Sequence, residues 1–514
     1  MKKKQNELDR RSFMGATVGA AAGIGAGALL PRKAFSQQGP PGTSASTGPG
    51  LYRLEADIHD CEIEGTIPSD LNGAFYRVGP DPQYPLADGN IPFDGEGHVS
   101  MFRIKNGRVD YKSRFVRNDR YLAQAEAGRL LFPMYRNPYM NDPSVAGLSR
   151  STANTHIINH KNMLLALKED SPPSAMDLLT LETLVPNYTF DDQLPSETFT
   201  AHPKLDSRTG NMVAFGYEAT GHGSNVVSMF EFTPDGERVW DATITVPYVG
   251  MLHDFAVTER YIVFYVIPMA IDEPQMQAGG IHWSWDGTKP THFGFVRRDG
   301  DGSDVRWIQG PTRSATHIMG AFSDDDQLYI DVEMSMSNPF PFMPMRDGGR
   351  WDPVAGASHI TRMSVDLTQR TPTNYGIEQL YPHQGALPRQ DDRYNTVPYR
   401  YGFLGCPDPN AAPGTRGGAC YARFDHQTRT DTLYNAGPTT SLAENCFAPK
   451  NADAGEGEGY LMGLATRNDQ NGRSDLVILD AEHLDEGPVA TVRLPMRAPG
   501  QVHGWWVPED QMPG

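Results

Sequence analysis

Short hydrophobic runs of five to seven residues recur along most of the 514-residue chain. Turn-forming pairs such as Asp235-Gly236 and Asp299-Gly300 separate them, and runs bounded in this way favour β-strands. Only 119–129 has the spacing of an amphipathic helix. Many short strands without alternating helices predict an all-β architecture. The clearest runs lie at 163–167, 212–217, 261–267, 328–332, 459–464 and 475–480.

Two arrangements of these strands compete, a series of β-sandwiches and a single β-propeller. Roughly 460 residues of strands and turns would fill several sandwiches, but no change in composition marks a domain boundary. A propeller accommodates that length as one domain, with the inner strands of successive blades around its axis. No strict repeat is visible. The chain length and the number of strands therefore carry the argument for the propeller.

The first 36 residues predict an export signal. Arg10-Arg11 precede Phe13 and the Gly/Ala-rich stretch 13–30, a pattern that resembles a twin-arginine signal, and Ser36 ends an acceptable cleavage site. A membrane anchor is the alternative, but five glycines in eighteen residues make a poor span. We expect residues 1–36 to direct export to the periplasm, 37–50 to be a disordered linker, and 51–514 to be the propeller domain.

Charge and cysteine content narrow the function classes. A net charge of -18 without a Lys/Arg stripe argues against nucleic-acid binding. The chain has no CxxC motif, which argues against a thiolate metal site, and disulfide pairing stays open. The four cysteines are Cys61, Cys406, Cys420 and Cys446.

Four histidines, distant in sequence, each lie at or just before a β-forming run: His202, His253, His317 and His503. Neutral imidazole is the commonest protein ligand for transition metals. A single histidine beside an apolar strand is more often a structural, hydrogen-bonded residue. Four of them on the inner strands of a radial fold would instead converge on an axial metal.

The remaining histidines have other interpretations. His98, in Phe-Asp-Gly-Glu-Gly-His, is the strongest rival for a functional role, and His156 and His160 fit a hydrophobic core. The other eight lie in polar, loop-like contexts, and we expect them to be exposed. They are His59, His222, His282, His292, His359, His383, His426 and His483.

Five stretches resemble the carotenoid cleavage oxygenases, in order along nearly the whole chain from about residue 51 to 508. They are 65–80, 93–97 (Phe-Asp-Gly-Glu-Gly), 201–204 (Ala-His-Pro-Lys), 253–255 (His-Asp-Phe) and 499–504 (Pro-Gly-Gln-Val-His-Gly). The resemblance implies an all-β, seven-bladed propeller with a loop and helix lid over an axial metal site. It also implies one Fe(2+) per subunit, held by His202, His253, His317 and His503. Four neutral ligands would keep the site at +2 and leave positions open for dioxygen.

The family also places glutamates where they orient the ligand rings. Glu169 and Glu444 match two of these positions; for each, the alternative is an exposed charge at a strand end. At the third position this chain has Ala386. We therefore expect water or a carbonyl to hold one ring.

Within the family, the stretches 132–138, 152–155 and 165–170 look like the lignostilbene dioxygenase branch. Those enzymes cleave the interphenyl double bond of phenolic stilbenes with O2 and release two aromatic aldehydes. The resemblance assigns Tyr135 and Lys168 to the substrate's 4-hydroxyl, where an ammonium and a second phenol would favour its deprotonation. Lys168 could alternatively be a solvated surface lysine. Phe93 is a candidate for stacking on the substrate.

The principal hypothesis is therefore an exported iron dioxygenase for hydroxystilbenes, and its co-substrate is O2. The alternatives are cleavage of a carotenoid, apocarotenoid or phenylpropene, or a propeller that binds without catalysis. A non-catalytic propeller would not need four candidate ligands. The substrate's ring substituents and the oligomeric state stay open.

Overall fold

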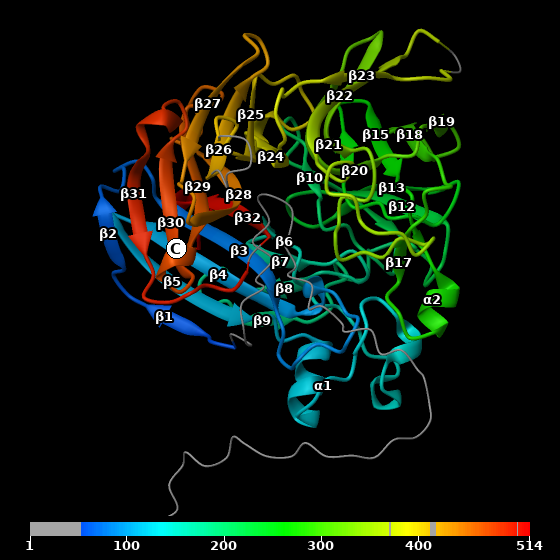
Figure 1. Cartoon of the computed structure of the whole chain (residues 1–514), viewed down its shortest axis with the longest axis horizontal. Coiled ribbons are helices and arrows are strands. Elements are labelled where there is room, and N and C mark those ends of the chain that lie inside the picture. Colours follow the sequence, from blue (N-terminus) through cyan, green and yellow to red (C-terminus); the bar gives the residue numbers. More distant parts are fainter. Residues whose placement is uncertain (1–52, 370–371, 412–417, 501, 514) are drawn as a thin grey trace, which may run out of the picture. The chain divides into compact units, whose positions relative to one another are not determined.

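Seven antiparallel sheets of four or five strands follow one another around a central axis in the computed structural model (Figure 1). The structure describes residues 53–369, 372–411, 418–500 and 502–513. The predicted export signal and the predicted linker lie outside the described residues. The prediction of an all-β, seven-bladed propeller is confirmed. The described strands form one closed ring, so the chain needs no change of composition to mark a domain boundary.

Each sheet is one blade of the propeller. The first four blades in chain order are β6(His156–His160) to β9(Thr183–Val185), with β7(Met163–Leu167) and β8(Ser174–Met176); β10(Lys204–Leu205), β11(Met212–Tyr217), β12(Val226–Phe232) and β13(Arg238–Thr245); β14(Phe255–Val257), β15(Tyr261–Val266), β18(Thr291–Arg297) and β19(Arg306–Gly310); and β20(Ser314–Ser323), β21(Gln327–Ser335), β22(His359–Asp366) and β23(Gly376–Gln379).

Of the other three blades, one has four consecutive strands, and two combine strands from both ends of the described chain. They are β24(Ala386–Gln390), β25(Tyr401–Pro407), β26(Ala419–Asp425) and β27(Thr430–Asn435); β28(Thr440–Pro449), β29(Gly459–Arg467), β30(Arg473–Asp480), β31(Pro488–Arg493) and β2(Glu62–Gly65); and β32(His503–Pro508), β3(Gly73–Asp81), β4(Glu96–Lys105), β5(Arg108–Phe115) and β1(Ala56–Ile58). A separate two-stranded sheet joins β16(Met269–Ile271) to β17(Trp283–Trp285).

The ring is closed by exchange of strands between its first and last blades. The C-terminal strand β32 pairs with β3, so that His503 lies opposite Val78, and the N-terminal strand β2 pairs with β31. The guanidinium of buried Arg77 reinforces this closure by donating to the carbonyls of Glu444 and Val502, each at 2.6 Å. Closure joins the first and last blades through paired strands, so the ring has no open gap between them.

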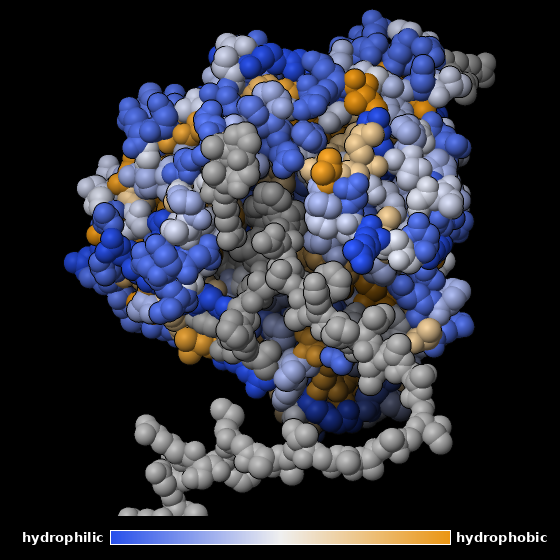
Figure 2. Space-filling view, viewed as in Figure 1, coloured by the Kyte–Doolittle hydropathy of each residue, from blue (hydrophilic) through white to orange (hydrophobic). Residues whose placement is uncertain are grey.

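The inner strands are the part of the fold that positions the site. Contacts run around the axis between neighbouring inner strands, from β14 to β20, β24, β28, β32 and β6. The blades pack through apolar faces, and the described surface in Figure 2 is largely hydrophilic with scattered apolar residues. Within the described residues, no helix is long and apolar enough to cross a membrane.

The predicted helix is α1(Asp119–Ala127). The Asn118 side chain accepts from the Tyr121 N–H to begin it, and Gly128 ends it in the left-handed conformation, with φ 66°. A second helix, α2(Glu273–Gln277), was not predicted; it is too short to show a helical period. The described residues also form seven short 3-10 segments: η1(Pro92–Asp94), η2(Pro138–Met140), η3(Pro143–Val145), η4(Asp392–Tyr394), η5(Asn468–Gln470), η6(Leu484–Glu486) and η7(Glu509–Gln511).

All four cysteines are buried as free thiols. Cys406 and Cys420 lie opposite each other on β25 and β26, whereas Cys61 and Cys446 lie in other blades. The question that the sequence left open is thus answered in favour of thiols in this structure.

Arg120 fastens α1 to the propeller, and its loss should destabilise the protein. The buried guanidinium lies 2.9 Å from Glu96 and 3.4 Å from Asp94. Arg120→Met would leave both carboxylates buried without their cation, so the free energy of unfolding should fall by about 3–5 kcal/mol. Arg117→Met, which removes a partly exposed pair with Glu55, should cost about 0–1 kcal/mol. Denaturant unfolding checks both values; equal losses would contradict the account.

Candidate metal centre

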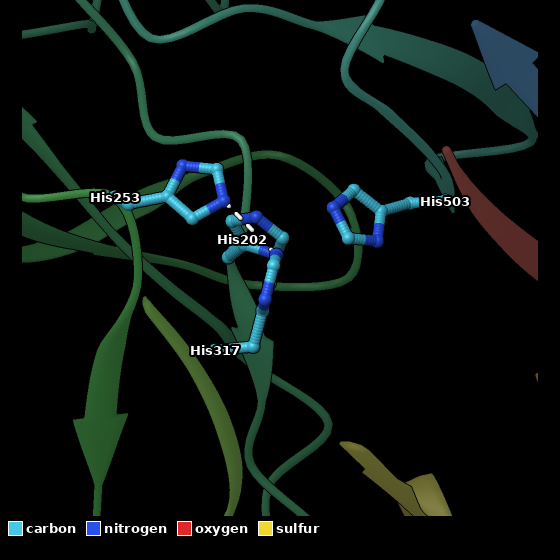
Figure 3. A group of neighbouring side chains, drawn as sticks. All are labelled: His202, His253, His317 and His503. Carbon is cyan, nitrogen blue, oxygen red and sulfur yellow. Dashed lines mark hydrogen bonds between the residues drawn. The ribbon is translucent and has the colours of Figure 1, made fainter. Parts of the chain in front are cut away.

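The four histidines predicted as ligands meet at the axis (Figure 3). His202 lies two residues before β10, His253 lies two residues before β14, and His503 begins β32. His317 lies within β20, where the pairing with β21 shifts register on both sides of Ile318. Such a bulge redirects a side chain, and it turns the His317 ring toward the axis.

One nitrogen of each ring in this group faces the other three rings. One nitrogen from each ring lies within 4.8 Å of all the others. The Nε2 atoms of His253 and His317 are 3.0 Å apart, while the buried Nε2 atoms of His202 and His503 have no hydrogen-bond partner. Buried polar atoms without partners are costly, and two of them beside a pair of facing imidazole nitrogens mark a place for a cation.

Three carboxylates hold three of the rings by their other nitrogen. His253 Nδ1 bonds Glu169, His503 Nδ1 bonds Glu444 at 2.8 Å, and His317 Nδ1 bonds Glu333 at 2.7 Å. All three carboxylates are buried. Carboxylates that orient imidazole ligands in this way are the usual outer contacts of a metal site.

The protonation states of these pairs suit a metal. Burial alone would raise the pKa of Glu169, but His253 and Lys168 hold that pKa at about 2, and His503 with Arg389 holds the Glu444 pKa below its usual range. An ionised carboxylate only accepts, so each paired Nδ1 carries the hydrogen. Burial also lowers the pKa of His503 to about 4. Burial lowers the pKa of His202 as well, so the rings of His202 and His503 are neutral, and their Nε2 lone pairs are free to bind a transition metal.

The third carboxylate comes from a place that the sequence did not indicate. Ala386 is buried at the start of β24, and the ring of His317 is held by a carboxylate rather than by the expected water or carbonyl. Glu333, on β21, supplies the carboxylate, and its Oε2 also accepts from the Leu387 N–H at 3.1 Å. The expectation for this ring was wrong because Glu333, on the strand paired with β20, reaches His317.

Glu333→Ala should weaken metal binding by about 10–100-fold, because the His317 ring loses the group that fixes its orientation and tautomer. Adding Ala386→Glu to that variant should restore part of the affinity by supplying a carboxylate next to Leu387, whose N–H contacts Glu333 in the parent protein. Iron affinity, measured by competition with a chelator, checks both. Glu378→Ala, in the exposed strand β23 of the same blade, is the control. Unchanged affinity in Glu333→Ala would contradict the assignment.

Asp254 ties three of the histidine-bearing segments together. Its Oδ2 accepts from the Ile318 N–H at 2.9 Å, and its Oδ1 lies 2.7 Å from Lys204 Nζ. These partners each lie within two residues of a clustered histidine. The His-Asp-Phe motif does not by itself indicate this role, because the role depends on contacts between blades.

Tyr135 and Lys168 also meet, as the sequence predicted for a phenol site. Both side chains are 4% exposed, and Lys168 Nζ lies 3.4 Å from the Tyr135 hydroxyl, with Thr155 Oγ1 at 3.3 Å. Lys168 is thus not a surface lysine. Burial lowers its pKa, but the charges of Tyr135 and Glu169 outweigh burial and leave the pKa raised, so it remains an ammonium. Burial likewise raises the pKa of Tyr135, which stays a phenol.

The structure also locates the other residues that the sequence suggested for a function or for the core. Phe93, in η1, packs edge-to-face on Phe342 with ring centroids 5.3 Å apart. The ring of His156 lies 5.2 Å from that of His503, but its Nδ1 bonds the Ala201 carbonyl. His98 and His160 are outside the metal group: they contact Asp81 and the Thr233 carbonyl.

A small polar cavity borders the cluster, with His156, His202, His317 and Glu444 among its lining residues. Neither Tyr135 nor Lys168 lines it. The phenol site and this cavity are therefore formed by different residues.

Known proteins resemble the chain over most of its length. The family model described as retinal pigment epithelial membrane protein matches residues 51–508. Lignostilbene-alpha,beta-dioxygenase isozyme III of Sphingomonas paucimobilis is 39% identical, over 92% of this chain and 99% of its own.

Solved structures agree with that relationship. The crystal structure of Pseudomonas brassicacearum lignostilbene dioxygenase superposes with a TM-score of 0.85 at 40% identity, covering 89% of this chain and 97% of that one. Cobalt-substituted Synechocystis ACO superposes with a TM-score of 0.77 at 25% identity and the same coverage. The resemblance noted in the sequence is confirmed: the chain belongs to the retinal pigment epithelial membrane protein family, which is the family of the carotenoid cleavage oxygenases.

Proposed function

We propose that this chain is an iron(II)-dependent dioxygenase that cleaves the interphenyl double bond of 4-hydroxystilbenes. One stilbene and one O2 give two aromatic aldehydes, and each aldehyde receives one of the two oxygen atoms. The observation that carries the proposal is the buried Lys168–Tyr135 pair, which adjoins the Glu169–His253 contact.

Iron(II) is the metal that fits the proposed chemistry. The residues that would hold it are His202, His253, His317 and His503 through their Nε2 atoms, with Glu169, Glu333 and Glu444 orienting three rings. An all-imidazole donor set adds no charge and suits a divalent transition metal. When bound, iron(II) supplies the dioxygen chemistry. The cobalt in the Synechocystis relative supports a divalent metal in this fold.

The chain's own residues then act on the substrate's phenol. An ammonium beside a phenol lowers that phenol's pKa, so Lys168 favours the phenolate of the substrate's 4-hydroxyl, and the Tyr135 hydroxyl can donate to it. A phenolate pushes electron density into the conjugated double bond, which makes the bond more reactive toward an oxidant. An apolar polyene offers no partner for this buried cation, and desolvating an ammonium without a partner is costly.

Oxygen uptake by the iron-loaded protein tests this proposal. We expect rapid uptake with 4-hydroxystilbene and far slower uptake with 4-methoxystilbene, in which a methyl group replaces the acidic proton. A phenylpropene and an apocarotenoid complete the comparison. Equal rates with the hydroxy and methoxy compounds would overturn the phenol site, and faster uptake with the apocarotenoid would favour the alternative substrate class.

We also propose that the protein is exported to the periplasm by the twin-arginine route. The support is the sequence alone, with Arg10-Arg11 before the apolar stretch 13–30. The route carries folded proteins, so the metal could be inserted before export. Cell fractionation tests it: Arg10→Lys with Arg11→Lys should leave the protein in the cytoplasm, and periplasmic accumulation of this variant would contradict the route.

A further inference from the structure

A second group of histidine and carboxylate side chains lies outside the axial cluster. It consists of Glu218, directly after β11, His222, in the turn to β12, and His282, directly before β17. One potential ligand atom from each lies within 4.8 Å of the other two. The polar, loop-like surroundings of His222 and His282 in the sequence predict that both are exposed. His222 is, but that expectation is wrong for His282, which is 1% exposed.

The buried ring of His282 presents a lone pair to a carboxylate. Its Nδ1 lies 3.2 Å from the Arg136 carbonyl, which only accepts, so Nδ1 carries the hydrogen. Nε2 has no hydrogen-bond partner and faces Glu218 Oε2 at 3.2 Å. Burial lowers the pKa of His282 more than Glu218 raises it, which disfavours a second proton on the ring. Two electron-rich atoms therefore face each other in a buried place.

That separation is the one expected of two ligands on a single small cation. Nitrogen and oxygen ligands about 2.0–2.1 Å from a tetrahedral zinc lie about 3.3 Å apart. Two imidazoles and a carboxylate are also a common ligand set for zinc. One cation bound by both atoms would thus offset the repulsion between the lone pairs of His282 and Glu218.

Glu218 is held ready for such an ion. Its Oε1 accepts from the Gly223 N–H and its Oε2 from Arg136, each at 2.7 Å. Burial raises its pKa, but His282 and Arg136 outweigh burial and hold the pKa at about 2. The carboxylate is thus ionised and fixed, and each oxygen keeps a lone pair for a further contact.

His222 completes the group from a tight turn. Gly221 and Gly223, which flank it, have φ of 113° and 74°, a backbone region that glycine tolerates best. The ring stands edge-on to that of His282, with centroids 5.3 Å apart. His222 Nε2 also lies 2.8 Å from Glu273 on α2, so a second carboxylate stands beside the group.

We propose that Glu218, His222 and His282 form a second, structural metal site of the zinc class, with Glu273 beside its fourth position. An ion there joins the β11–β12 turn to the segment before β17. It also steadies Arg136, which donates to Glu218 and, at 2.6 Å, to the Tyr217 hydroxyl. Tyr217 in turn donates to Glu169 at 3.0 Å. The proposed site thus supports a carboxylate of the axial centre from behind.

Zinc titration of the iron-loaded protein tests the site while the axial histidines are filled. Zinc and iron are both counted by elemental analysis after desalting. We expect the parent protein to take up one zinc per chain and keep its iron, and its Tm to rise with zinc concentration. His222→Ala, at an exposed position, should keep its iron and lose zinc affinity by more than about tenfold, since even removal of a group that only orients a ligand costs that much.

His59→Ala is the matched control, because His59 is an exposed histidine in another blade. It should bind zinc as the parent does. Three outcomes would overturn the proposal: no zinc beyond the iron, zinc uptake matched by loss of iron, or equal zinc affinity in His222→Ala and the parent. None of these readings depends on the substrate or on turnover.

Discussion

Replacing His317 by alanine is expected to abolish iron binding and, with it, oxygen-dependent cleavage. Its Nε2 is one of the four that converge at the axis, and its Nδ1 is fixed by Glu333. Removing a ligand should weaken iron binding by more than the roughly 10–100-fold that follows loss of an orienting carboxylate. Iron content after desalting and oxygen uptake with 4-hydroxystilbene should fall together.

The control for this variant is another buried histidine. His160 Nε2 contacts the Thr233 carbonyl at 3.0 Å and is not one of the axial group. His160→Gln can preserve that hydrogen bond through its amide and should keep its iron. A His317→Ala protein that retains a full complement of iron would show that the metal lies elsewhere.

The second large effect is expected at the phenol site. Lys168→Met keeps the length of the side chain but removes its charge, so it should lower kcat for 4-hydroxystilbene by about 10²–10³-fold, the usual cost of losing one preorganised electrostatic contact. Tyr135→Phe removes a single hydroxyl and should cost about tenfold. Iron content should stay unchanged in both variants, because neither side chain belongs to the four-histidine group.

Substrate pairs separate this effect from general damage. With 4-methoxystilbene, which has no proton to lose, Lys168→Met should differ little from the parent protein. Lys161→Met, at the exposed end of the β6–β7 hairpin, should behave as the parent with both substrates. If Lys168→Met slowed both stilbenes equally, the lysine would serve only to shape the pocket.

Much of this centre could be predicted because its groups lie in recognisable local sequences. Each of the four histidines lies within an inner strand, at its start or two residues before it, and the resemblance of the local sequences to the family predicted Glu169 and Glu444. The pairing of Tyr135 with Lys168 followed from the same matching. The architecture followed from strand number and chain length, since a closed ring is an economical way to bury so many short strands.

The groups that were missed depend on register and on contacts between distant segments. Glu333 is sixteen residues beyond His317, and only the bulge in β20 brings the two side chains together. A polar neighbourhood suggested that His282 is exposed, but the Tyr135–Arg136 segment covers it through two hydrogen bonds, one of them to its backbone. Neither arrangement can be seen without knowing which strands lie side by side.

The central claim is that axial iron(II) lets this chain cleave a phenolic stilbene with dioxygen. The most direct measurement is the product balance when the iron-loaded protein and its chelator-stripped form act on 4-hydroxystilbene. We predict that the iron-loaded form consumes one O2 per stilbene and releases one 4-hydroxybenzaldehyde and one benzaldehyde, while the stripped form is inactive until iron(II) is restored. Absence of aldehydes from the iron-loaded protein, or equal turnover by the stripped form, would contradict the claim.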